Sequence, residues 1–426
     1  MTTVYKKRIA DRMLSDKLEA MGAVLIEGPK GCGKTTTAEQ QARSVLYMDH
    51  PEHADQYRQM AQTNIRFLLQ GETPRLIDEW QTIPRFWDAI RFEVDHRDED
   101  GQFILTGSAV PPDSREIHHT GTGRYGWLTM RPMSLWESGD SNGGISLKEL
   151  FHSPEQIACS CDMTLERLAF LACRGGWPKS TSKKSERAAL IQAIEYYEAI
   201  TRSDISRVDQ IQRDEERAKR LMRSYARHQG TQTGIPTILA DIASNEAEDI
   251  SGATVSSYLD ALRKIFVIED MPAWNPNLRS KTAIRTSDTR YFVDPSIACA
   301  ALGLGPMDLI NDLRTFGLFF ETLCVRDLRV YADALDGKVY HFRDKHGLEC
   351  DSVVHLRNGS YGLIEIKLGG DNLIEEGAKS LLLLSDKIDT TRMKAPAFKM
   401  ILTGIGKYAY KRPDGVLVVP IGCLKD

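Results

Sequence analysis

Hydrophobic positions along the chain change their spacing several times, and each change predicts a different kind of element. In the first part, three short apolar runs have the composition of buried strands. They read "AVLIE" at 23–27, "RLID" at 75–78 and "FILTG" at 103–107, and the stretch after the first, "TTTAEQQARSVL", predicts a helix. Short buried strands separated by helical stretches predict an α/β fold for this part of the chain.

After residue 140 the apolar spacing becomes helical. A stretch at 139–146 that is rich in Gly, Ser and Asn predicts the loop that leaves the first domain. Two apolar helices separated by the turn "GGWP" follow, and then an exposed helix of mixed charge. These three helices are expected at 165–174, 187–205 and 206–228.

Residues 218–292 predict a compact unit of three helices and a hairpin, an order that resembles a winged helix. The helix that begins at the capping residue Ser251 would present polar side chains outward, and the segment after it would supply a basic wing. The expected contact residues are Thr254, Ser257, Tyr258, Arg279, Lys281 and Arg285. Such a surface suggests contact with DNA phosphates. The alternative is a protein–protein module, because nearby acidic residues reduce the positive charge.

The last part of the chain, 293–426, again mixes helices and strands. A strongly apolar helix at 313–335 is predicted to carry Glu321. The runs "KVYHFRDKHGLECDSVVHL" and "GSYGLIEIKL" predict strands joined by a hairpin turn at Asn358-Gly359. A further helix, "NLIEEGAKSLLLLSDKI", and the strands "FKMILTG" and "GVLVVPIG" complete an α/β unit.

Length and composition narrow the class of protein. The 426 residues exceed the usual size of one core, so two or three domains are expected. A hydrophobic content of 42% and a charged content of 27% are typical of a globular protein. The net charge of −4 does not indicate a global nucleic-acid binder, although local basic patches stay open. There is no signal-peptide pattern and no run of about 18 apolar residues, so we expect a cytoplasmic protein that has no membrane partner.

The eight cysteines are scattered and form no pair of CxxC motifs, which a usual zinc site would need. The one close pair, Cys159 and Cys161, has too short a spacing and no second pair beside it. We expect free, mostly buried thiols, the common state in a reducing compartment.

The stretch "GPKGCGKT" fits the pattern GxxxxGK[ST] of a phosphate-binding loop and lies between a predicted strand and a predicted helix. Glycines let backbone N–H groups converge on phosphates, Lys34 would neutralise the β and γ oxygens, and Thr35 would ligate Mg²⁺. The alternative is a glycine-rich turn that matches by chance. We expect ATP and Mg²⁺ here, with contacts from Gly28, Pro29, Lys30, Gly31, Cys32, Gly33, Lys34, Thr35 and Thr36.

Asp78 and Glu79 end the second apolar run and supply the acids that hydrolysis of ATP needs. Asp78 would hold the metal through a water molecule, and Glu79 would orient and deprotonate the attacking water. The third run ends in Thr106, Gly107 and Ser108. A hydroxyl there, Ser108 in particular, can contact the γ-phosphate; a strand-terminating turn is the alternative.

Arg124 is flanked by glycine-containing sequence, so a loop could carry it toward the γ-phosphate of a neighbouring subunit. An arginine in that position stabilises the charge of the transition state. Arg131 and Arg97 compete for the same role, and a solvated side chain is the alternative for Arg124.

The order of these motifs resembles the AAA+ ATPases, whose core ends in a G-R-x(n)-P-[ML]-[ST]-L-x-E segment. The resemblance covers roughly residues 1–140 and rests on "GPKGCGKTTTA", "LIDEWQTIPRFWDAIRFEVD", "FILTGSA" and "GTGRYGWLTMRPMSLWESG". It implies a small α/β ATPase core that assembles as a ring or a dimer. The helices that follow would form its lid.

Asp351, Glu365 and Lys367 form a second chemical pattern. Because strand residues alternate between faces, Glu365 and Lys367 point the same way, and Asp351 can lie close to Glu365 across the hairpin. Two carboxylates and an ammonium suit metal-assisted phosphodiester cleavage: the carboxylates hold Mg²⁺, and the lysine positions water or neutralises charge. The alternative is a surface hairpin with an ion-paired Glu and Lys.

These residues resemble the PD-(D/E)xK nuclease fold of restriction-type endonucleases. Glu321 matches its helical acid, Asp351 its first strand acid, and Glu365 and Lys367 its ExK pair, so the three acids are implied as metal ligands. No proline precedes Asp351, where the chain reads "ECD". Such domains also exist as binding platforms, so cleavage stays open.

The whole order resembles a large prokaryotic family of ATPases with a C-terminal region of unknown function. We expect an ATPase core, a helical lid and connector, a winged helix and a nuclease-like domain at 1–140, 141–217, 218–292 and 293–426. ATP hydrolysis would then gate a DNA-binding domain in a homo-oligomer. The alternative is an ATP-dependent switch or scaffold that binds a protein partner and whose nuclease-like domain is inactive.

Overall fold

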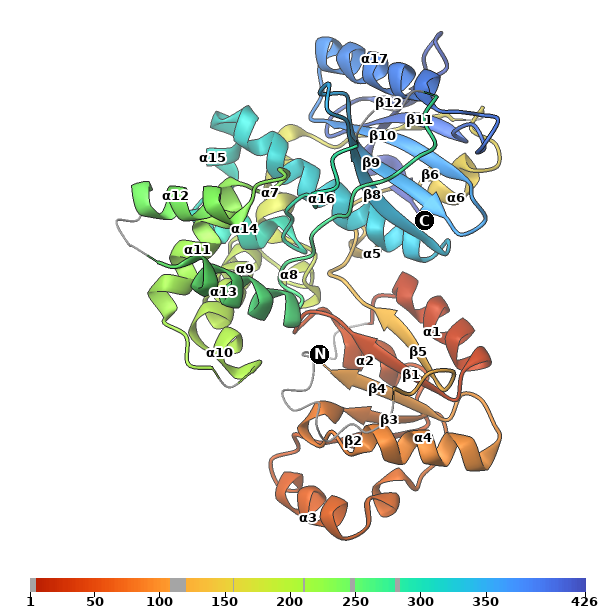
Figure 1. Cartoon of the computed structure of the whole chain (residues 1–426), viewed down its shortest axis with the longest axis vertical. Coiled ribbons are helices and arrows are strands. Elements are labelled where there is room, and N and C mark those ends of the chain that lie inside the picture. The colour runs from red at the N-terminus through yellow and green to blue at the C-terminus, as the bar shows by residue number, and fades with distance from the viewer. Residues whose placement is uncertain (1–4, 108–119, 156, 210, 246–249, 280–283) are drawn as a thin grey trace.

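The computed structural model describes residues 5–107, 120–155, 157–209, 211–245, 250–279 and 284–426. Figure 1 shows an α/β sheet near the N-terminus, a group of helices, and a second sheet near the C-terminus. Among the described helices, none is both long and apolar enough to cross a membrane.

The N-terminal sheet has five parallel strands in the order β2-β3-β4-β1-β5. The three apolar runs of the sequence form its β1, β3 and β4. The strands are β1 (Ala23–Glu27), β2 (Ser44–Tyr47), β3 (Arg75–Asp78), β4 (Phe103–Gly107) and β5 (Tyr125–Thr129). Because all the strands run the same way, the residues that follow β1, β3 and β4 meet at one edge of the sheet.

Alternate residues of these strands face two different layers of helices, as strand geometry requires. Val24 and Ile26 pack with α1 and α2, whereas Ala23 and Leu25 pack with α3 and α4. The helices and short turns of this region are α1 (Ile9–Ala20), α2 (Lys34–Glu39), α3 (Ala54–Asn64), η1 (Ile65–Leu69), η2 (Trp80–Thr82) and α4 (Phe86–Arg97). Burial on both faces explains why the strands are continuous apolar runs.

The sequence predicted a helical lid and connector at 141–217. The first part of this segment, however, contains two short strands as well as helices. After α5 (Leu135–Ser138) it forms β6 (Ile145–Ser146), α6 (Leu147–Leu150) and β7 (Cys159–Ser160). β6 pairs with β14 and β7 pairs with β12, so this segment lies beside the C-terminal sheet (Figure 1). Strand pairing across more than 250 residues leaves no local signal in the sequence.

The middle of the chain is helical, as predicted. Its elements are α7 (Leu165–Arg174), α8 (Pro178–Thr181), α9 (Glu186–Ala199), the π-helical turn η4 (Ile200–Asp204), α10 (Ile205–Arg207), α11 (Glu215–Arg227), α12 (Ile235–Asn245), α13 (Gly252–Lys264), α14 (Pro295–Leu302) and α15 (Pro306–Asn311). α14 packs on α7, α9 and α11, and α15 packs on α7. These two helices therefore belong with the middle region, although the expected boundary at residue 293 assigned them to the last domain.

The segment expected to be a wing lies against the C-terminal region. Isolated bridges join Ile268 to Phe292 and Met271 to Thr289, but the chain between them then pairs with β8 and with the end of α17. Arg279 N donates to Lys387 O and Arg285 N to Arg343 O. Lys281 lies outside the described residues.

The outward position expected for Tyr258 is wrong. The residue is 6% exposed, and its hydroxyl accepts a hydrogen bond from Asp214 N. Ser257 accepts a hydrogen bond from Arg213 through its Oγ. Helix α13 packs this face against the chain before α11, a contact that helical periodicity alone does not specify.

The C-terminal region is a mixed sheet in the order β7-β12-β13-β11-β10-β9-β8. Ile364 and Ile366 face α16, and Leu363 lies in the cluster that includes Leu381 of α17. The elements are α16 (Leu313–Asp333), β8 (Gly337–Arg343), β9 (Glu349–Leu356), β10 (Tyr361–Lys367), α17 (Asp371–Lys387), β11 (Phe398–Thr403), β12 (Tyr408–Lys411), β13 (Leu417–Pro420), η5 (Ile421–Cys423) and β14 (Leu424–Lys425).

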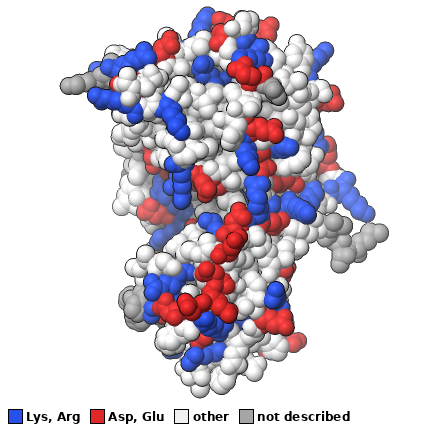
Figure 2. Space-filling view, turned by 90° about the vertical axis from the view of Figure 1, so that its right-hand side faces the viewer, with Lys and Arg blue, Asp and Glu red and all other residues white. Residues whose placement is uncertain are grey.

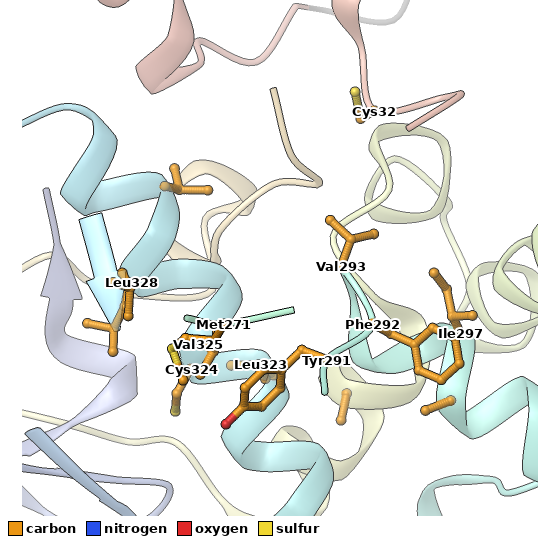
Figure 3. Close-up of a cluster of buried hydrophobic side chains, with 14 of the residues drawn as sticks. Cys32, Met271, Tyr291, Phe292, Val293, Ile297, Leu323, Cys324, Val325 and Leu328 are labelled. Atoms are coloured by element: carbon orange, nitrogen blue, oxygen red, sulfur yellow. The ribbon is translucent and has the colours of Figure 1, made fainter. Parts of the chain in front are cut away.

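One apolar cluster includes residues from all three regions. Figure 3 shows part of it, with Tyr291 beside Leu323 of α16 and Phe292 beside Ile297 of α14. These residues are almost fully buried. The three regions therefore share one packed core and are not joined only by flexible linkers.

Candidate nucleotide site and carboxylate–lysine cluster

The loop between β1 and α2 depends on glycine at three positions. Gly28, Gly31 and Gly33 have φ angles of 148°, 75° and 105°, a range that other residues rarely adopt. A Cβ atom on Gly28 would also lie 2.0 Å from the Met130 carbonyl oxygen. The glycines thus let the chain turn tightly and lead into the amino end of α2, where free backbone N–H groups attract anions.

Lys34 begins α2, and its side chain turns back over the loop. Its Nζ donates to the carbonyl oxygens of Gly28 and Pro29 at 2.9 and 3.0 Å. The residue is only 6% exposed. Neither acceptor carries a charge, so these bonds hold the ammonium in place without neutralising it.

Three side chains from neighbouring elements meet beneath the loop. Thr35 Oγ1 and Thr106 Oγ1 both donate to Asp78 Oδ1, at 2.7 and 2.5 Å. Burial raises the pKa of Asp78, and the two hydroxyl groups oppose that shift. A hydroxyl and a carboxylate next to a phosphate loop are hard oxygen donors, which suit Mg²⁺ bound with a nucleotide.

Glu79 follows β3 in a left-handed backbone conformation, with φ 56° and ψ 43°. Residues other than glycine adopt it at a cost, often at functional sites. Gln81 Nε2 donates to Glu79 Oε2, and burial raises the pKa of the Glu79 carboxyl. A higher pKa makes this carboxylate a better proton acceptor near neutral pH.

A cleft of about 400 Å³ lies beside Glu79, between the N-terminal sheet and the middle helices. Lys30 of the loop and Arg207 of α10 line it, and Lys30 Nζ is 3.3 Å from Asp204 Oδ1. Sequence reasoning missed Arg207 because only the packing of the middle helices brings it to the loop. The cleft joins residues of two regions at one site.

The other expected nucleotide contacts lie close by. Cys32 Sγ is 3.5 Å from Met130 O, and Thr36 lines a second cavity of about 230 Å³ together with Tyr5 and Lys179. Ser108 lies outside the described residues, so its expected role stays a prediction.

Arg8, which the sequence did not single out, contacts the phosphate loop. It is 7% exposed, and its guanidinium donates to Cys32 O and to Arg131 O at 2.8 Å each. Its Nε pairs with Glu137 Oε1 at 3.0 Å. Arg8 thus connects the loop to the segment after β5. In the sequence, the one signal of a buried arginine was Glu137, an acid within the apolar end of the first domain that needs a positive partner.

The three candidate arginines lie in different surroundings. Arg124, just before β5, pairs with Asp95 at 2.7 Å and its side chain is 44% exposed. That position is at the opposite edge of the sheet from the loop, because Tyr125 pairs with the first residue of β1. Arg131 is buried between Glu269 and Asp333, at 2.7 and 2.5 Å, and Arg97 pairs with Glu93.

The C-terminal residues predicted to meet do so where β9 and β10 separate. Strand pairing ends at Ser352–Ile364, and Asp351 Oδ2 then accepts a hydrogen bond from Ile366 N at 2.7 Å. Lys367 Nζ lies 3.2 Å from Asp351 Oδ2 and 2.6 Å from Glu365 Oε2. One ammonium therefore bridges both carboxylates.

Electrostatics tune this cluster strongly. Burial and the negative charge of Asp351 raise the pKa of Glu365 well above its ordinary value. The same two causes raise the pKa of Glu321, on α16, to about 8, although the Tyr291 hydroxyl donates to its carboxylate. Glu321 is therefore held largely protonated near neutral pH.

The chemistry of Asp351 and Glu365 suits a hard divalent cation. Within the described ranges, however, no three His, Cys, Asp or Glu side chains are grouped as a metal site. The Lys367 ammonium supplies the positive charge between the two carboxylates instead. A cation that bound there would compete with Lys367.

The face of the molecule in Figure 2 carries both signs of charge. On the face in Figure 2, Lys and Arg side chains are interspersed with Asp and Glu, and acidic residues cross its lower part. This pattern agrees with the net charge of −4.

Three family models match separate segments of the chain. Residues 21–138 match a family described as "AAA domain". Residues 165–308 and 316–424 match families described as "Domain of unknown function (DUF8612)" and "Domain of unknown function (DUF4143)". The chain thus has an AAA domain, which implies nucleotide binding with Mg²⁺ as the typical ion, followed by two domains of unknown function.

The chain is also similar to two mycobacterial proteins. It is 22% identical over 386 residues to the uncharacterized protein Rv2008c of Mycobacterium tuberculosis, a match that covers 89% of this chain and 78% of that protein. The uncharacterized protein Mb2031c of Mycobacterium bovis matches with the same values.

Two solved structures share only a distant likeness with the chain. The Orc1 protein of Aeropyrum pernix in complex with DNA has a TM-score of 0.25 and 13% identity, over 70% of this chain and 93% of that chain. The Hef helicase domain of Pyrococcus furiosus has a TM-score of 0.22 and 12% identity, over 94% of this chain and 86% of that chain. Scores this low establish no common overall fold.

Proposed function

We propose that this protein binds and hydrolyses ATP at the phosphate loop, and that the nucleotide state acts on a DNA-handling C-terminal region. The observation that carries the ATPase proposal is the contact of Thr35 and Thr106 with Asp78 beneath the loop. This contact connects Thr35, which follows Lys34 in the loop, to Asp78 at the end of β3.

Lys34 has the central role in binding. A triphosphate offers its ammonium charged acceptors in place of the carbonyl oxygens of Gly28 and Pro29, and charge-assisted hydrogen bonds are stronger. Backbone N–H groups at the start of α2 would donate to the same phosphates. Mg²⁺, held by Thr35 and Asp78, would supply further positive charge to the phosphate oxygens.

Glu79 accepts the proton of the attacking water in the proposed hydrolysis. Its raised pKa and its hydrogen bond from Gln81 suit that task. Arg124 is too far around the sheet to reach the loop of its own subunit, so its proposed role requires a second copy of the chain.

The loop is connected to the C-terminal region through the end of β5. The Met130 carbonyl lies against Gly28, and the next residue, Arg131, pairs with Asp333 at the end of α16. α16 also carries Glu321. A shift of the loop on nucleotide binding can therefore displace α16, and with it the Glu321 carboxyl beside the carboxylate–lysine cluster.

We further propose that the C-terminal region is nuclease-like and holds DNA near Asp351, Glu365 and Lys367. The order of α16, β8, β9, β10, α17 and β11, with the cluster where two strands separate, supports this proposal. DNA would contact the segment with Arg279 and Arg285, which lies along the same region. The contacts of Lys367 favour the second candidate, a switch or scaffold, because the lysine already pairs with both acids.

The proposal is tested by ATP turnover of the purified full chain alone, with single-stranded DNA and with duplex DNA. The same samples, with Mg²⁺ or Mn²⁺, are run on a gel to detect cutting. Stimulation by DNA together with cutting that Lys367→Ala abolishes supports the nuclease. Turnover unchanged by DNA, with intact DNA, supports the switch.

Glu79→Gln tests the assigned base. We expect turnover to fall by about 100-fold or more, since a positioned base contributes roughly that much. ATP should still bind, as a retained fluorescent nucleotide would report. Normal turnover by the variant would show that another group accepts the proton.

A further inference from the structure

Three thiols meet where the connector lies against the end of the C-terminal sheet. Cys159 Sγ and Cys423 Sγ lie 3.3 and 3.4 Å from the Ser160 carbonyl oxygen. A Cβ atom on Gly422 would be 2.8 Å from Cys161 Sγ, so the residue next to Cys423 packs directly on that sulfur. Residues from opposite ends of the fold thus form one thiol cluster, which we define as Cys159, Cys161 and Cys423.

The surroundings of Cys161 favour its thiolate. The neighbouring Cys423 thiol and the backbone at Met163 and Gly422 favour the charged form of this sulfur. Together they lower the pKa of Cys161 to about 6, although burial and the charge of Asp162 oppose the shift. The thiolate is the nucleophile in cysteine chemistry, so these surroundings favour reaction at Cys161 over the other thiols of the cluster.

A cleft brings solvent to the edge of Cys161, which is itself 7% exposed. The cleft has a volume of about 840 Å³ and is also lined by Thr403, Lys407 and Tyr408. The cleft is comparable in size to ordinary small-molecule sites.

A second thiol pair provides an internal contrast. Cys173 and Cys299 also contact each other, but burial and the Cys173 thiol raise the pKa of Cys299 well above its ordinary value. Cys299 is therefore expected to stay protonated and unreactive.

We propose that the thiol cluster is a reversible oxidation site, in which a low-molecular-weight disulfide converts Cys161 and Cys423 into an intramolecular disulfide. The Cys161 thiolate attacks the S–S bond of the reagent, forms a mixed disulfide and releases one thiolate. Cys423 then loses its proton and attacks the Cys161 sulfur, which releases the second thiolate. The reagent gains two electrons and both protons, and the protein loses two hydrogen atoms.

The new bond would fix the connector to the C-terminal strand. β7 begins at Cys159 and β14 begins just after Cys423, so the link joins two short edge elements. Each of these elements pairs through only two residues, and hydrogen bonds from Ser141 and Ser146 to Leu424 and Asp426 add to the pairing. Oxidation would therefore hold the connector in place.

The test treats the full chain with oxidised glutathione and maps its disulfides by mass spectrometry. We expect a Cys161–Cys423 link, which dithiothreitol reverses and Cys161→Ser prevents. Cys423→Ala should instead accumulate glutathione on Cys161. Cys299→Ser is the matched control and should leave the link unchanged.

Alkylation of Cys161 gives a second readout that does not require the link. Its rate should rise through an inflection near pH 6, and Cys423→Ala should move that inflection upward because the neighbouring thiol that lowers the pKa is lost. Equal oxidation of the Cys173–Cys299 pair, a mixed disulfide that persists on Cys161 in the parent chain, or protection of all three thiols by added Zn²⁺ would overturn the proposal.

Discussion

Lys34 follows β1 and Lys367 ends β10, yet their ammonium groups contact different kinds of atoms. Lys34 donates to two backbone carbonyl oxygens, whereas Lys367 pairs with two carboxylates. The acids differ in the same way. Asp78 is held by two hydroxyl groups, and Glu365 is held by the lysine itself.

The different partners of the two lysines determine what each site can bind. At the phosphate loop the positive charge is positioned but not neutralised, so the site is prepared for an anion. At the C-terminal cluster the lysine already pairs with two acids, so a substrate or metal must compete with internal ion pairs. The first site is ready to bind, whereas the second needs a rearrangement.

The largest expected effect is at the first lysine. Lys34→Ala should reduce ATP turnover by at least about 100-fold, because it removes the charge aimed at the developing negative charge. Steady-state phosphate release measures it. Arg58→Ala is the control, since Arg58 lies on α3, away from the loop, and its side chain is 53% exposed. A similar loss in both variants would mean that Lys34 is not specifically responsible.

The second lysine should affect stability more than binding. Lys367→Met leaves two partly buried carboxylates without their partner, and loss of such a partner costs about 3 kcal/mol. Added Mg²⁺ should raise the melting temperature of this variant more than that of the parent chain. Lys379→Met, on the exposed side of α17, serves as the control. If Mg²⁺ stabilises the parent equally, Lys367 does not compete with the cation.

Arg131 tests the connection between the two sites. Arg131→Met should lower the free energy of unfolding by about 3 kcal/mol, because Asp333 loses its buried partner and Glu269 keeps Arg329 at 3.6 Å. Burial opposes the shift, but Arg131 and Arg329 lower the pKa of Glu269 from 4.5 to about 2. This contribution is therefore full above pH 4.5 and disappears as the pH falls toward 2. Denaturant unfolding at several pH values measures the gap between variant and parent.

The difference in unfolding free energy between Arg131→Met and the parent chain needs a control. Arg58→Met removes an exposed ion pair with Asp55 and should change the stability little at any pH. A gap for Arg131→Met that stays constant down to pH 2 would show that packing, rather than the ion pair, is responsible.

The smallest effect on the isolated chain is expected at Arg124. Arg124→Ala breaks an exposed pair with Asp95, so the melting temperature should not change measurably. Turnover per subunit should fall only at protein concentrations where copies associate. A concentration series compares this variant with Arg97→Ala, and a loss confined to Arg97→Ala would transfer the role to that residue.

Local patterns predicted much of the two sites. The phosphate loop, Asp78 and the fork of Asp351, Glu365 and Lys367 follow from short-range rules: glycine conformations, strand alternation and a hairpin turn. These rules act over a few residues, so the sequence displays them directly.

Contacts between distant segments could not be predicted in the same way. The pairing of β6 and β7 with the C-terminal strands, the burial of Tyr258 and the role of Arg8 all depend on which surfaces meet after folding. The packing of α14 on α7 and α9 likewise depends on surfaces that meet only after folding. A helix pattern reveals an apolar face but not its partner.

The strands contributed by the connector make the C-terminal sheet discontinuous in sequence. A fragment that begins at residue 312 would leave β12 and β14 without β7 and β6, and unpaired strand edges invite association with other chains. If the C-terminal sheet were exchanged between related proteins, residues 141–161 would therefore have to be exchanged together with it. The two segments form one structural unit, although the middle helices separate them in the sequence.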